Sequence, residues 1–337
     1  MYSRPPNNIE FVKQLVKRLY NYEVKQIKEL NGADDRNYYL VTNYEKEFVL
    51  KITNTVEGSV PGLLDAVNSF ILLLHNNGFR VSVPQVNANG KYLSYEEIPS
   101  PDGQSVHESP LNTAYGVRLL EFISGKLLRD VPFTPQLLTE CGQVLAHMTI
   151  AIQTFESQVI SKRRPDWSLL NVLAVRQYID AVHNQEDRDV VSATLDEFER
   201  TVMPILDELE TNLIHGDFNE MNIIVHNNPN EHPDNEYHVK GVIDFGDIHY
   251  APRVFDLAIY LCYSMLFFTA GPPILAPAFG LKGYMKSIKL HENELNVLCT
   301  CIKARFCQSL VLGAHSYRLD PTNVYVLSSA KNGWPAL

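Results

Sequence analysis

The sequence predicts an α+β protein of two lobes: an N-terminal antiparallel sheet with a helix, and a larger, mainly helical C-terminal lobe. Three observations support this fold class: strand-like runs crowd the first 123 residues, Ser124-Gly125 breaks the pattern, and helical periodicity dominates afterwards. A length of 337 residues also suits two sizeable cores. We therefore predict lobes at 1–123 and 124–337, with a hinge at 119–125.

The elements of the N-terminal lobe follow from the spacing of its apolar residues. Helical spacing predicts helices over 8–20 and 62–76. Alternating or apolar runs predict strands, which can form one antiparallel sheet. The strands are expected at 24–30, 37–42, 47–53, 84–86, 92–98 and 117–123. Residues 99–110, rich in the turn residues Pro and Ser, predict an exposed loop.

The C-terminal lobe is predicted to consist mainly of long helices. They are expected over 135–156, 187–209, 255–268 and 292–317, with a bend in the second at Pro204. Short strand-like runs at 223–225 and 239–243 flank a polar insert, which predicts a hairpin.

Composition argues against several classes of protein. The 29 basic and 39 acidic residues give a formal charge of −10, which disfavours nucleic-acid binding as the main role. The five cysteines lack a framework spacing and predict free thiols in a reducing compartment. The N-terminus has no apolar signal core, and the longest apolar run, 254–270, is interrupted by Asp256. We expect a cytoplasmic protein that binds neither nucleic acid nor membrane.

Four polar residues, His215, Asp217, Asn222 and Asp244, lie between short apolar runs in the stretch 213–250. Asp217 and Asn222 have the D-x-x-x-x-N spacing of a kinase catalytic loop, and Asp244 begins a D-F-G triplet after an apolar strand. Phosphoryl transfer needs a residue that accepts or orients the proton of the attacking hydroxyl, and Mg²⁺ prefers oxygen ligands. We predict that Asp217 is catalytic and that Asn222 and Asp244 bind Mg²⁺.

A lysine completes this constellation. Lys51 ends the strand-like F-V-L-K run and is predicted to bind the α- and β-phosphates of a nucleotide, oriented by an acid on the following helix, Asp65. His215 is predicted to be a scaffold of the loop, and Asp256 to brace that loop from the start of a helix. The alternative is a buried polar network that only stabilises two adjacent hairpins, with Lys51 solvated and Asp65 favoured by the helix dipole.

The motifs also carry a family resemblance. H-G-D-F-N-E-M-N and I-D-F-G-D resemble the aminoglycoside phosphotransferase and choline kinase family, and the finer resemblance is to the hydroxylysine kinases. The finer resemblance rests on segments spread over most of the chain: V-R-L-L-E-F-I-S-G (117–125), P-Q-L-L-T-E-C-G (135–142), I-H-G-D-F-N-E-M-N-I (214–223), G-V-I-D-F-G-D-I (241–248) and R-F-C-Q-S-L-V (305–311).

The resemblance implies a protein-kinase-like fold and a kinase of 5-hydroxy-L-lysine in hydroxylysine catabolism, with GTP as donor. The spacing of the residues does not distinguish GTP from ATP. It further implies that backbone groups of Glu121 and Ile123 meet the base, and that Arg36 and Asn37 belong to the nucleotide loop. Family members tend to carry a further helical stretch beyond the position of Leu337.

The acceptor site is less sharply marked in the sequence. A hydroxylysine zwitterion requires carboxylates for its ammonium groups and a cation for its carboxylate. Asp247 and Arg305 are the candidates, against the alternatives of a capping Asp and a salt-bridged helix Arg. Two other functions stay open: a kinase of another amino alcohol, homoserine or a sugar, and a catalytically weak nucleotide-binding scaffold.

Overall fold

The computed structural model describes residues 4–32, 34–99, 114–228, 230, 236–321, 324–327 and 329–337. These residues group into two units. Unit 1 comprises Met1–Ser124 with Ser157–Ile160, and unit 2 comprises Gly125–Glu156 with Ser161–Leu337. The loop predicted at 99–110 falls almost wholly outside the described residues.

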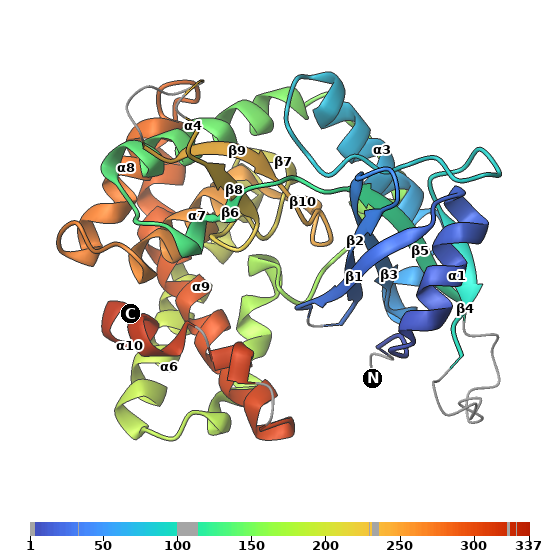
Figure 1. Cartoon of the computed structure of the whole chain (residues 1–337). Helices are drawn as coiled ribbons and strands as arrows, with labels where there is room; N and C mark the ends of the chain where they lie inside the picture. The colour runs from blue at the N-terminus through green and yellow to red at the C-terminus, as the bar shows by residue number, and fades with distance from the viewer. Residues whose placement is uncertain are drawn as a thin grey trace. The chain divides into compact units, whose positions relative to one another are not determined.

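Unit 1 is built on a five-stranded antiparallel sheet of order β1-β2-β3-β5-β4, in which neighbouring strands pair antiparallel (Figure 1). Its strands are β1 Val24–Leu30, β2 Arg36–Thr42, β3 Glu47–Thr53, β4 Ser94–Glu97 and β5 Ala114–Glu121. Its helices are α1 Ile9–Tyr20, α2 Thr55–Gly58 and α3 Leu63–Asn76. The segment 84–86 forms only an isolated bridge, between Pro84 and Leu120, instead of the predicted strand. Proline has no N–H to donate, which limits how far such pairing extends.

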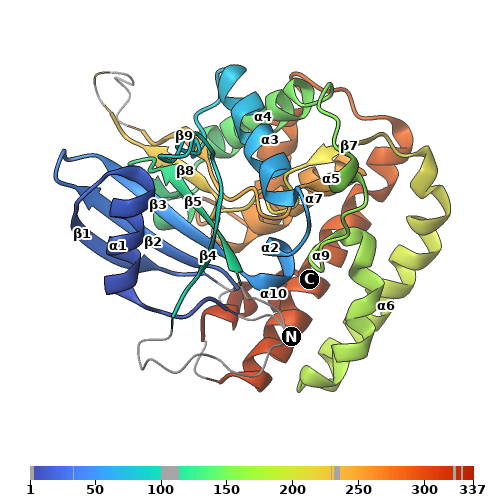
Figure 2. The ribbon, with the colours of Figure 1, turned by 90° about the vertical axis from the view of Figure 1, so that its right-hand side faces the viewer.

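The two faces of this sheet carry different side chains because alternate residues of a strand point to opposite sides. One face packs its apolar residues, among them Leu50 and Val117, against Leu15 and other apolar residues of α1. Lys51 and Arg118 are directly paired across β3 and β5 and belong to the opposite face, where Arg118 donates to Asn68 of α3 at 3.2 Å. The helices α1 and α3 therefore cover opposite faces of the sheet (Figure 2).

Unit 2 is mainly helical, as the sequence predicts, and contains two small antiparallel sheets. Strands β6 Lys126–Leu127, β8 Ile223–His226 and β9 His238–Val242 form one sheet, and β7 Thr211–Ile214 pairs with β10 His249–Pro252 in the other. The α-helices are α4 Pro135–Ala151, α6 Gln185–Thr201, α7 Arg253–Leu266, α8 Ala276–Tyr284, α9 Glu292–Leu319 and α10 Ala330–Ala336. The 3-10 helices are η1 Leu128–Asp130, η2 Leu169–Ala181, η3 Met203–Glu208, η4 Pro273–Leu275 and η5 Val324–Leu327, and the short α5 Gln158–Ser161 ends at the unit boundary.

One helix predicted in unit 2 is divided in the structure. The region predicted as one helix over 187–209 divides at Val202 into α6 and the 3-10 helix η3, whose first turn contains Pro204. A proline ring and its missing N–H disrupt α-helical bonding at this point.

Helix α9 has the length and composition that a membrane span would need, but 72% of its most apolar window is buried inside the protein. A buried core helix meets the same criteria.

Candidate active site

The loop between β7 and β8 is fixed by a carboxylate from helix α7. Asp256 lies in the first turn of α7 and accepts hydrogen bonds from the backbone N–H groups of His215, at 2.8 Å, and Gly216, at 2.9 Å. Burial raises the pKa of the Asp256 carboxyl, although the backbone N–H donors of His215 and Gly216 oppose the rise. The predicted bracing role of Asp256 is confirmed.

His215 supports the same loop from inside. Its Nδ1 accepts from the Asp217 N–H at 3.3 Å, and its Nε2 lies 3.1 Å from the carbonyl oxygen of Ile243. A carbonyl only accepts, so Nε2 carries the proton and the imidazole is neutral. With only 1% of its surface exposed, His215 is a scaffold residue, as predicted.

Gly216 is required by the backbone of this loop. Its φ is +81°, in the left-handed region that L side chains rarely adopt, and a Cβ there would lie 2.4 Å from the carbonyl oxygen of Asp247. The absence of a side chain lets the loop approach the segment after β9.

Asp217 receives three side-chain hydrogen bonds, and we name Asp217, Asn219, Asn222 and Arg305 the carboxylate site. Oδ1 of Asp217 accepts from Asn219 Nδ2 and from Arg305 Nη2, both at 2.8 Å, and Oδ2 accepts from Asn222 Nδ2 at 2.9 Å. The Asp217 side chain nevertheless keeps 26% of its surface exposed. It is therefore a well-oriented carboxylate that can still accept a proton from a bound hydroxyl.

Another acid in the loop, Glu220, was not singled out from the sequence. Its Oε2 is buried and has no hydrogen-bond partner among the residues that the structure describes. Burial, with a further contribution from the charge of Asp217, raises the pKa of Glu220 to about 7. The loop thus contains two carboxyl groups with very different surroundings, one rich in donors and one poor in them.

The predicted metal ligands offer the oxygen atoms that Mg²⁺ prefers. Asn222 uses its Nδ2 to donate to Oδ2 and to the carbonyl oxygen of Asp217, and no described residue donates to its Oδ1. The Ile243 N–H donates to the Asn222 carbonyl at 2.9 Å, so the residue that precedes Asp244 is tied to Asn222. Asp244 is exposed and has a φ of +58°, a strained conformation that recurs at functional sites. The two residues fit a magnesium ion.

In unit 1, Lys51 forms an ion pair with Asp35, which lies between β1 and β2. We name Lys51, Asp35 and Asn54 the lysine site. Lys51 Nζ lies 3.3 Å from Asp35 Oδ2, and Asp35 Oδ1 accepts from the Asn54 N–H at 2.8 Å and from Asn54 Nδ2 at 3.0 Å. The Asp65 side chain, the acid predicted from the sequence, is exposed on α3. The pairing of Lys51 with Asp65 stays a prediction.

The other residues predicted to meet the nucleotide lie around the same sheet. Asn37 is paired with Lys51 across β2 and β3, while Arg36 donates to Glu29 and to the Pro5 carbonyl. In the predicted hinge, the Glu121 N–H donates to the Val83 carbonyl at 2.8 Å. The N–H of Ile123 has no acceptor among the described residues, which suits the predicted contact with a base.

The two predicted substrate residues differ in accessibility. Asp247 is half-buried, and its carbonyl accepts from His249 Nδ1 at 2.7 Å. Arg305 is 1% exposed, and its guanidinium contacts Asp217, Trp167 and Gln308. Burial opposes its charged form, but Tyr263 and Asp217 outweigh that effect and the pKa of Arg305 is raised. The sequence did not indicate the contact of Arg305 with Asp217.

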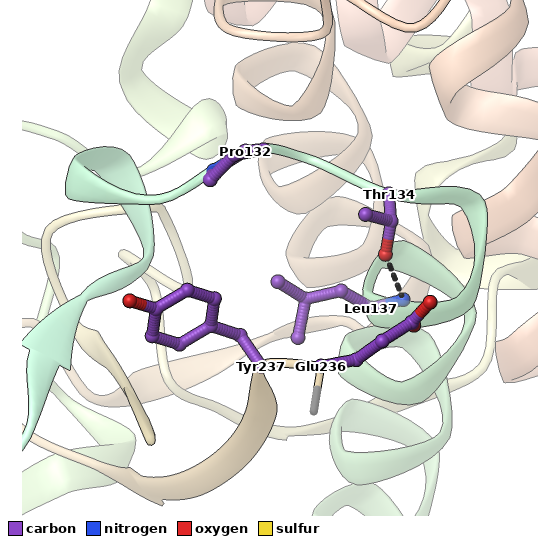
Figure 3. Close-up of a pocket in the computed structure, with 5 residues that line it drawn as sticks. All are labelled: Pro132, Thr134, Leu137, Glu236 and Tyr237. Carbon is purple, nitrogen blue, oxygen red and sulfur yellow. Dashed lines mark hydrogen bonds between the residues drawn. The ribbon is translucent and has the colours of Figure 1, made fainter. Parts of the chain in front are cut away.

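A pocket of about 180 Å³ in unit 2 lies at the start of α4 and contains none of the predicted site residues. Figure 3 shows Leu137 and Tyr237 projecting into it, beside Pro132, Thr134 and Glu236. Thr134 Oγ1 accepts from the Leu137 N–H at 3.2 Å as the N-cap of α4, and Lys126 donates to the Tyr237 hydroxyl at 2.8 Å. The cap by Thr134 stabilises the start of α4.

A group of three possible metal ligands, Glu210, His291 and Glu294, includes neither of the predicted magnesium residues. Arg253 occupies its centre: the guanidinium lies 2.8 Å from Glu210 Oε1 and 2.8 Å from Glu294 Oε1. Both carboxylates are therefore paired with one arginine, and the group is an ion-pair network.

Comparison with known proteins agrees with this fold. Residues 25–284 match the model of the phosphotransferase enzyme family, APH, and the chain belongs to this family. It is a small-molecule phosphotransferase with an alcohol group as acceptor.

Particular relatives narrow the resemblance. The chain is 31% identical over 335 residues to a hydroxylysine kinase of Xenopus laevis, covering 96% of this chain and 87% of the relative. It is 30% identical to a hydroxylysine kinase of Bos taurus, covering 96% and 86%. The sequence-based assignment to this group is confirmed.

Two solved structures share the fold. One is the amicoumacin kinase hAmiN in complex with AMP-PNP, Ca²⁺ and Ami, with a TM-score of 0.69, 18% identity, and coverage of 98% of this chain and 94% of that one. The other is a microcompartment-associated aminopropanol kinase, with a TM-score of 0.63, 15% identity, and coverage of 97% and 95%. The predicted kinase-like fold is confirmed.

Proposed function

We propose that this protein transfers the γ-phosphoryl group of GTP or ATP to the hydroxyl of 5-hydroxy-L-lysine, giving 5-phosphohydroxy-L-lysine, as a cytoplasmic step of hydroxylysine catabolism. The similarity to hydroxylysine kinases over 96% of the chain carries this proposal. The geometry of the carboxylate site supports the chemistry, because a hydrogen-bonded and partly exposed Asp217 suits a proton acceptor.

The reaction follows from the residues present. Asp217 accepts the proton of the substrate hydroxyl as that oxygen forms a bond to the γ-phosphorus. The bond from the γ-phosphorus to the bridging oxygen breaks, and the nucleoside diphosphate leaves with that electron pair. Asn222 and Asp244 would hold Mg²⁺, which neutralises phosphate charge when it is bound. A relative in fold, hAmiN, was solved with a nucleotide analogue and a divalent cation.

The donor and the acceptor would meet different groups of residues. Lys51 would bind the α- and β-phosphates, and backbone groups of Glu121 and Ile123 would meet the base. Arg36 and Asn37 would line the nucleotide loop. Asp247 is half-buried and would receive an ammonium group of the amino acid, because a carboxylate binds such a cation by charge-assisted hydrogen bonds.

The test is a phosphotransfer screen of the purified protein with GTP and ATP against hydroxylysine, homoserine, ethanolamine and choline. The expected product is phosphohydroxylysine, identified by phosphorus NMR, and its formation should stop when Mg²⁺ is chelated and resume when Mg²⁺ is restored. Preferential transfer to homoserine, ethanolamine or choline would replace hydroxylysine as the acceptor. Nucleotide binding without transfer to any acceptor would favour a scaffold.

A further inference from the structure

Arg305 is the largest fully buried side chain among the residues that the structure describes. It lies in the middle of α9, where most neighbouring positions are apolar. Removing a guanidinium from water is energetically costly unless its donors find partners. Its Nε has no partner among the described residues, so part of this cost is not offset. Costs of this kind tend to persist where function requires them.

The guanidinium is fixed by a frame of a backbone carbonyl, a side-chain amide and two aromatic rings. Nη1 donates to the Trp167 carbonyl at 2.8 Å and to Gln308 Oε1 at 2.9 Å, and the rings of Trp167 and Tyr263 lie 5.1 and 5.4 Å from Cζ. Gln308 Nε2 in turn donates to the carbonyls of Asp166 and Ser168, both at 3.2 Å. The frame leaves Nη2 directed at Asp217 Oδ1, at 2.8 Å.

The hydrogen bonds on Asp217 distinguish its two oxygens. A carboxylate oxygen offers about two acceptor positions. Oδ1 uses both, for Asn219 and Arg305, whereas Oδ2 uses one, for Asn222. The remaining acceptor position therefore lies on Oδ2, and this is where an incoming hydroxyl would place its proton.

We propose that Arg305 is a positioning residue for phosphoryl transfer, which occupies Oδ1 of Asp217 and presents Oδ2 to the acceptor hydroxyl, rather than a ligand of the substrate carboxylate. The proposal rests on the proposed function for its substrate, but it concerns only the residues of the carboxylate site. The planar fork of arginine suits this task because it reaches the Trp167 carbonyl and Asp217 at once, which the single ammonium of lysine does not.

Two substitutions separate positioning from substrate binding. Arg305→Met should lower kcat about 100-fold and Arg305→Lys about tenfold, because a misplaced base loses rate without loss of substrate affinity. KM for hydroxylysine should stay within about threefold. Arg305→Lys keeps the charge, and thus provides a readout if Arg305→Met does not fold; a retained nucleotide affinity would show that either variant is folded.

The decisive comparison uses an acceptor without a carboxylate, 1,5-diaminopentan-2-ol. If Arg305 positions Asp217, each variant should lower turnover of this diamine and of hydroxylysine by the same factor. If Arg305 binds the carboxylate, the loss should appear in KM for hydroxylysine alone, with the diamine unaffected, and that result would overturn the proposal. If the wild type prefers another acceptor, hydroxylysine is not the substrate, but the role of Arg305 can still be tested with that acceptor. An unchanged kcat of Arg305→Lys with it would refute the positioning role.

Arg253 provides the matched control. It is also a buried arginine in unit 2, with Nε and Nη2 each donating to Glu294 at 2.8 Å. Arg253→Lys should lower the melting temperature and leave kcat unchanged, so an equal loss of kcat at both arginines would indicate a merely structural Arg305.

A readout independent of activity is a double-mutant cycle of Arg305→Met and Asp217→Asn on the free energy of unfolding. Non-additive losses are expected, and strict additivity would show that the pair does not form.

Discussion

The lysine site of unit 1 and the carboxylate site of unit 2 are held in different ways. Lys51 has an ion pair of 3.3 Å with Asp35, and Asn54, which braces Asp35, lies 19 residues from it in the chain. Asp217 accepts three bonds of 2.8–2.9 Å, one of them from Arg305, which is 88 residues away. The lysine site is thus built from segments close in the chain, whereas the carboxylate site joins the loop between β7 and β8 to the distant helix α9.

The difference matches the tasks that the proposed reaction assigns to them. A lysine ammonium is a compact charge on a flexible stem, so it can follow a phosphate over some distance. A proton acceptor must lie within hydrogen-bond reach of one hydroxyl, and a displacement of about 1 Å can cost a factor of about 100 in rate. Tight, multiple bonds are therefore expected at the carboxylate and a looser pair at the lysine.

The largest effect is expected from Asp217→Asn. Asparagine keeps the shape and one acceptor oxygen for Arg305 but cannot take up the proton, so kcat should fall about 1,000-fold. Nucleotide affinity, measured by calorimetry, should stay close to that of the wild type. Near-normal turnover would remove Asp217 as the proton acceptor and would make the bonds of the carboxylate site purely structural.

Gly216→Ala should have the next largest effect. It adds the cost of a left-handed alanine to that of a Cβ placed 2.4 Å from the Asp247 carbonyl, and we expect a loss of about 3 kcal/mol in the free energy of unfolding. Urea denaturation measures this loss, and kcat should fall as the loop shifts.

Gly78 is the matched control for Gly216. Its φ is +86°, nearly the same, but a Cβ there would meet nothing within 4 Å. Gly78→Ala should therefore cost only the backbone term, about 1 kcal/mol, without a change in kcat. Equal losses at the two glycines would show that the close approach to Asp247 is unimportant.

A third prediction concerns the support of the carboxylate site under acid. His249 Nδ1 donates to the Asp247 carbonyl, and its Nε2 lies 2.6 Å from the Ser168 hydroxyl, next to the segment that binds Arg305. Burial lowers the pKa of His249 to about 4, with Arg163 and Arg164 contributing in the same direction. The unfolded chain therefore binds a proton near pH 6.5 that the folded protein does not bind until about pH 4.

The stability that depends on a neutral His249 is present above about pH 6.5 and is lost as the pH falls towards about 4. Between about pH 7 and about pH 5 the loss from His249 should be about 2 kcal/mol. Urea unfolding at both pH values should show a loss smaller by that amount in His249→Gln than in the wild type. The same pH dependence in both proteins would rule out His249 as its source.

The two sites also differ in how far the sequence predicts them. The spacing of Asp217 and Asn222 and the strand that contains Lys51 could be recognised because each motif is contiguous. The brace from Asp256 was predicted as well, since it lies at the start of a recognisable helix. Local periodicity likewise predicts most helices and strands, whereas the short β6, β7 and β10 carry too few residues for a pattern.

Other contacts between distant segments could not be predicted. Arg305 stands in an apolar helix, and its position in the sequence says that it is unusual but not which carboxylate it meets. The contact of Lys51 with Asp35, which are closer in the chain, was not predicted from the sequence either. A helix that follows the lysine strand made Asp65 the natural candidate, but the hairpin between β1 and β2 brings Asp35 to Lys51.

The smallest predicted effect compares these two acids. Asp35→Asn removes the charge that faces Lys51 while retaining an oxygen for Asn54, so KM for the nucleotide should rise about fivefold with little change in KM for the acceptor. Asp65→Asn, on the exposed face of α3, should change the nucleotide KM by less than about twofold. The reverse order would assign Asp65 as the acid that orients Lys51 when nucleotide is bound, and the lysine site would then depend on a rearrangement that the rigid carboxylate site does not need.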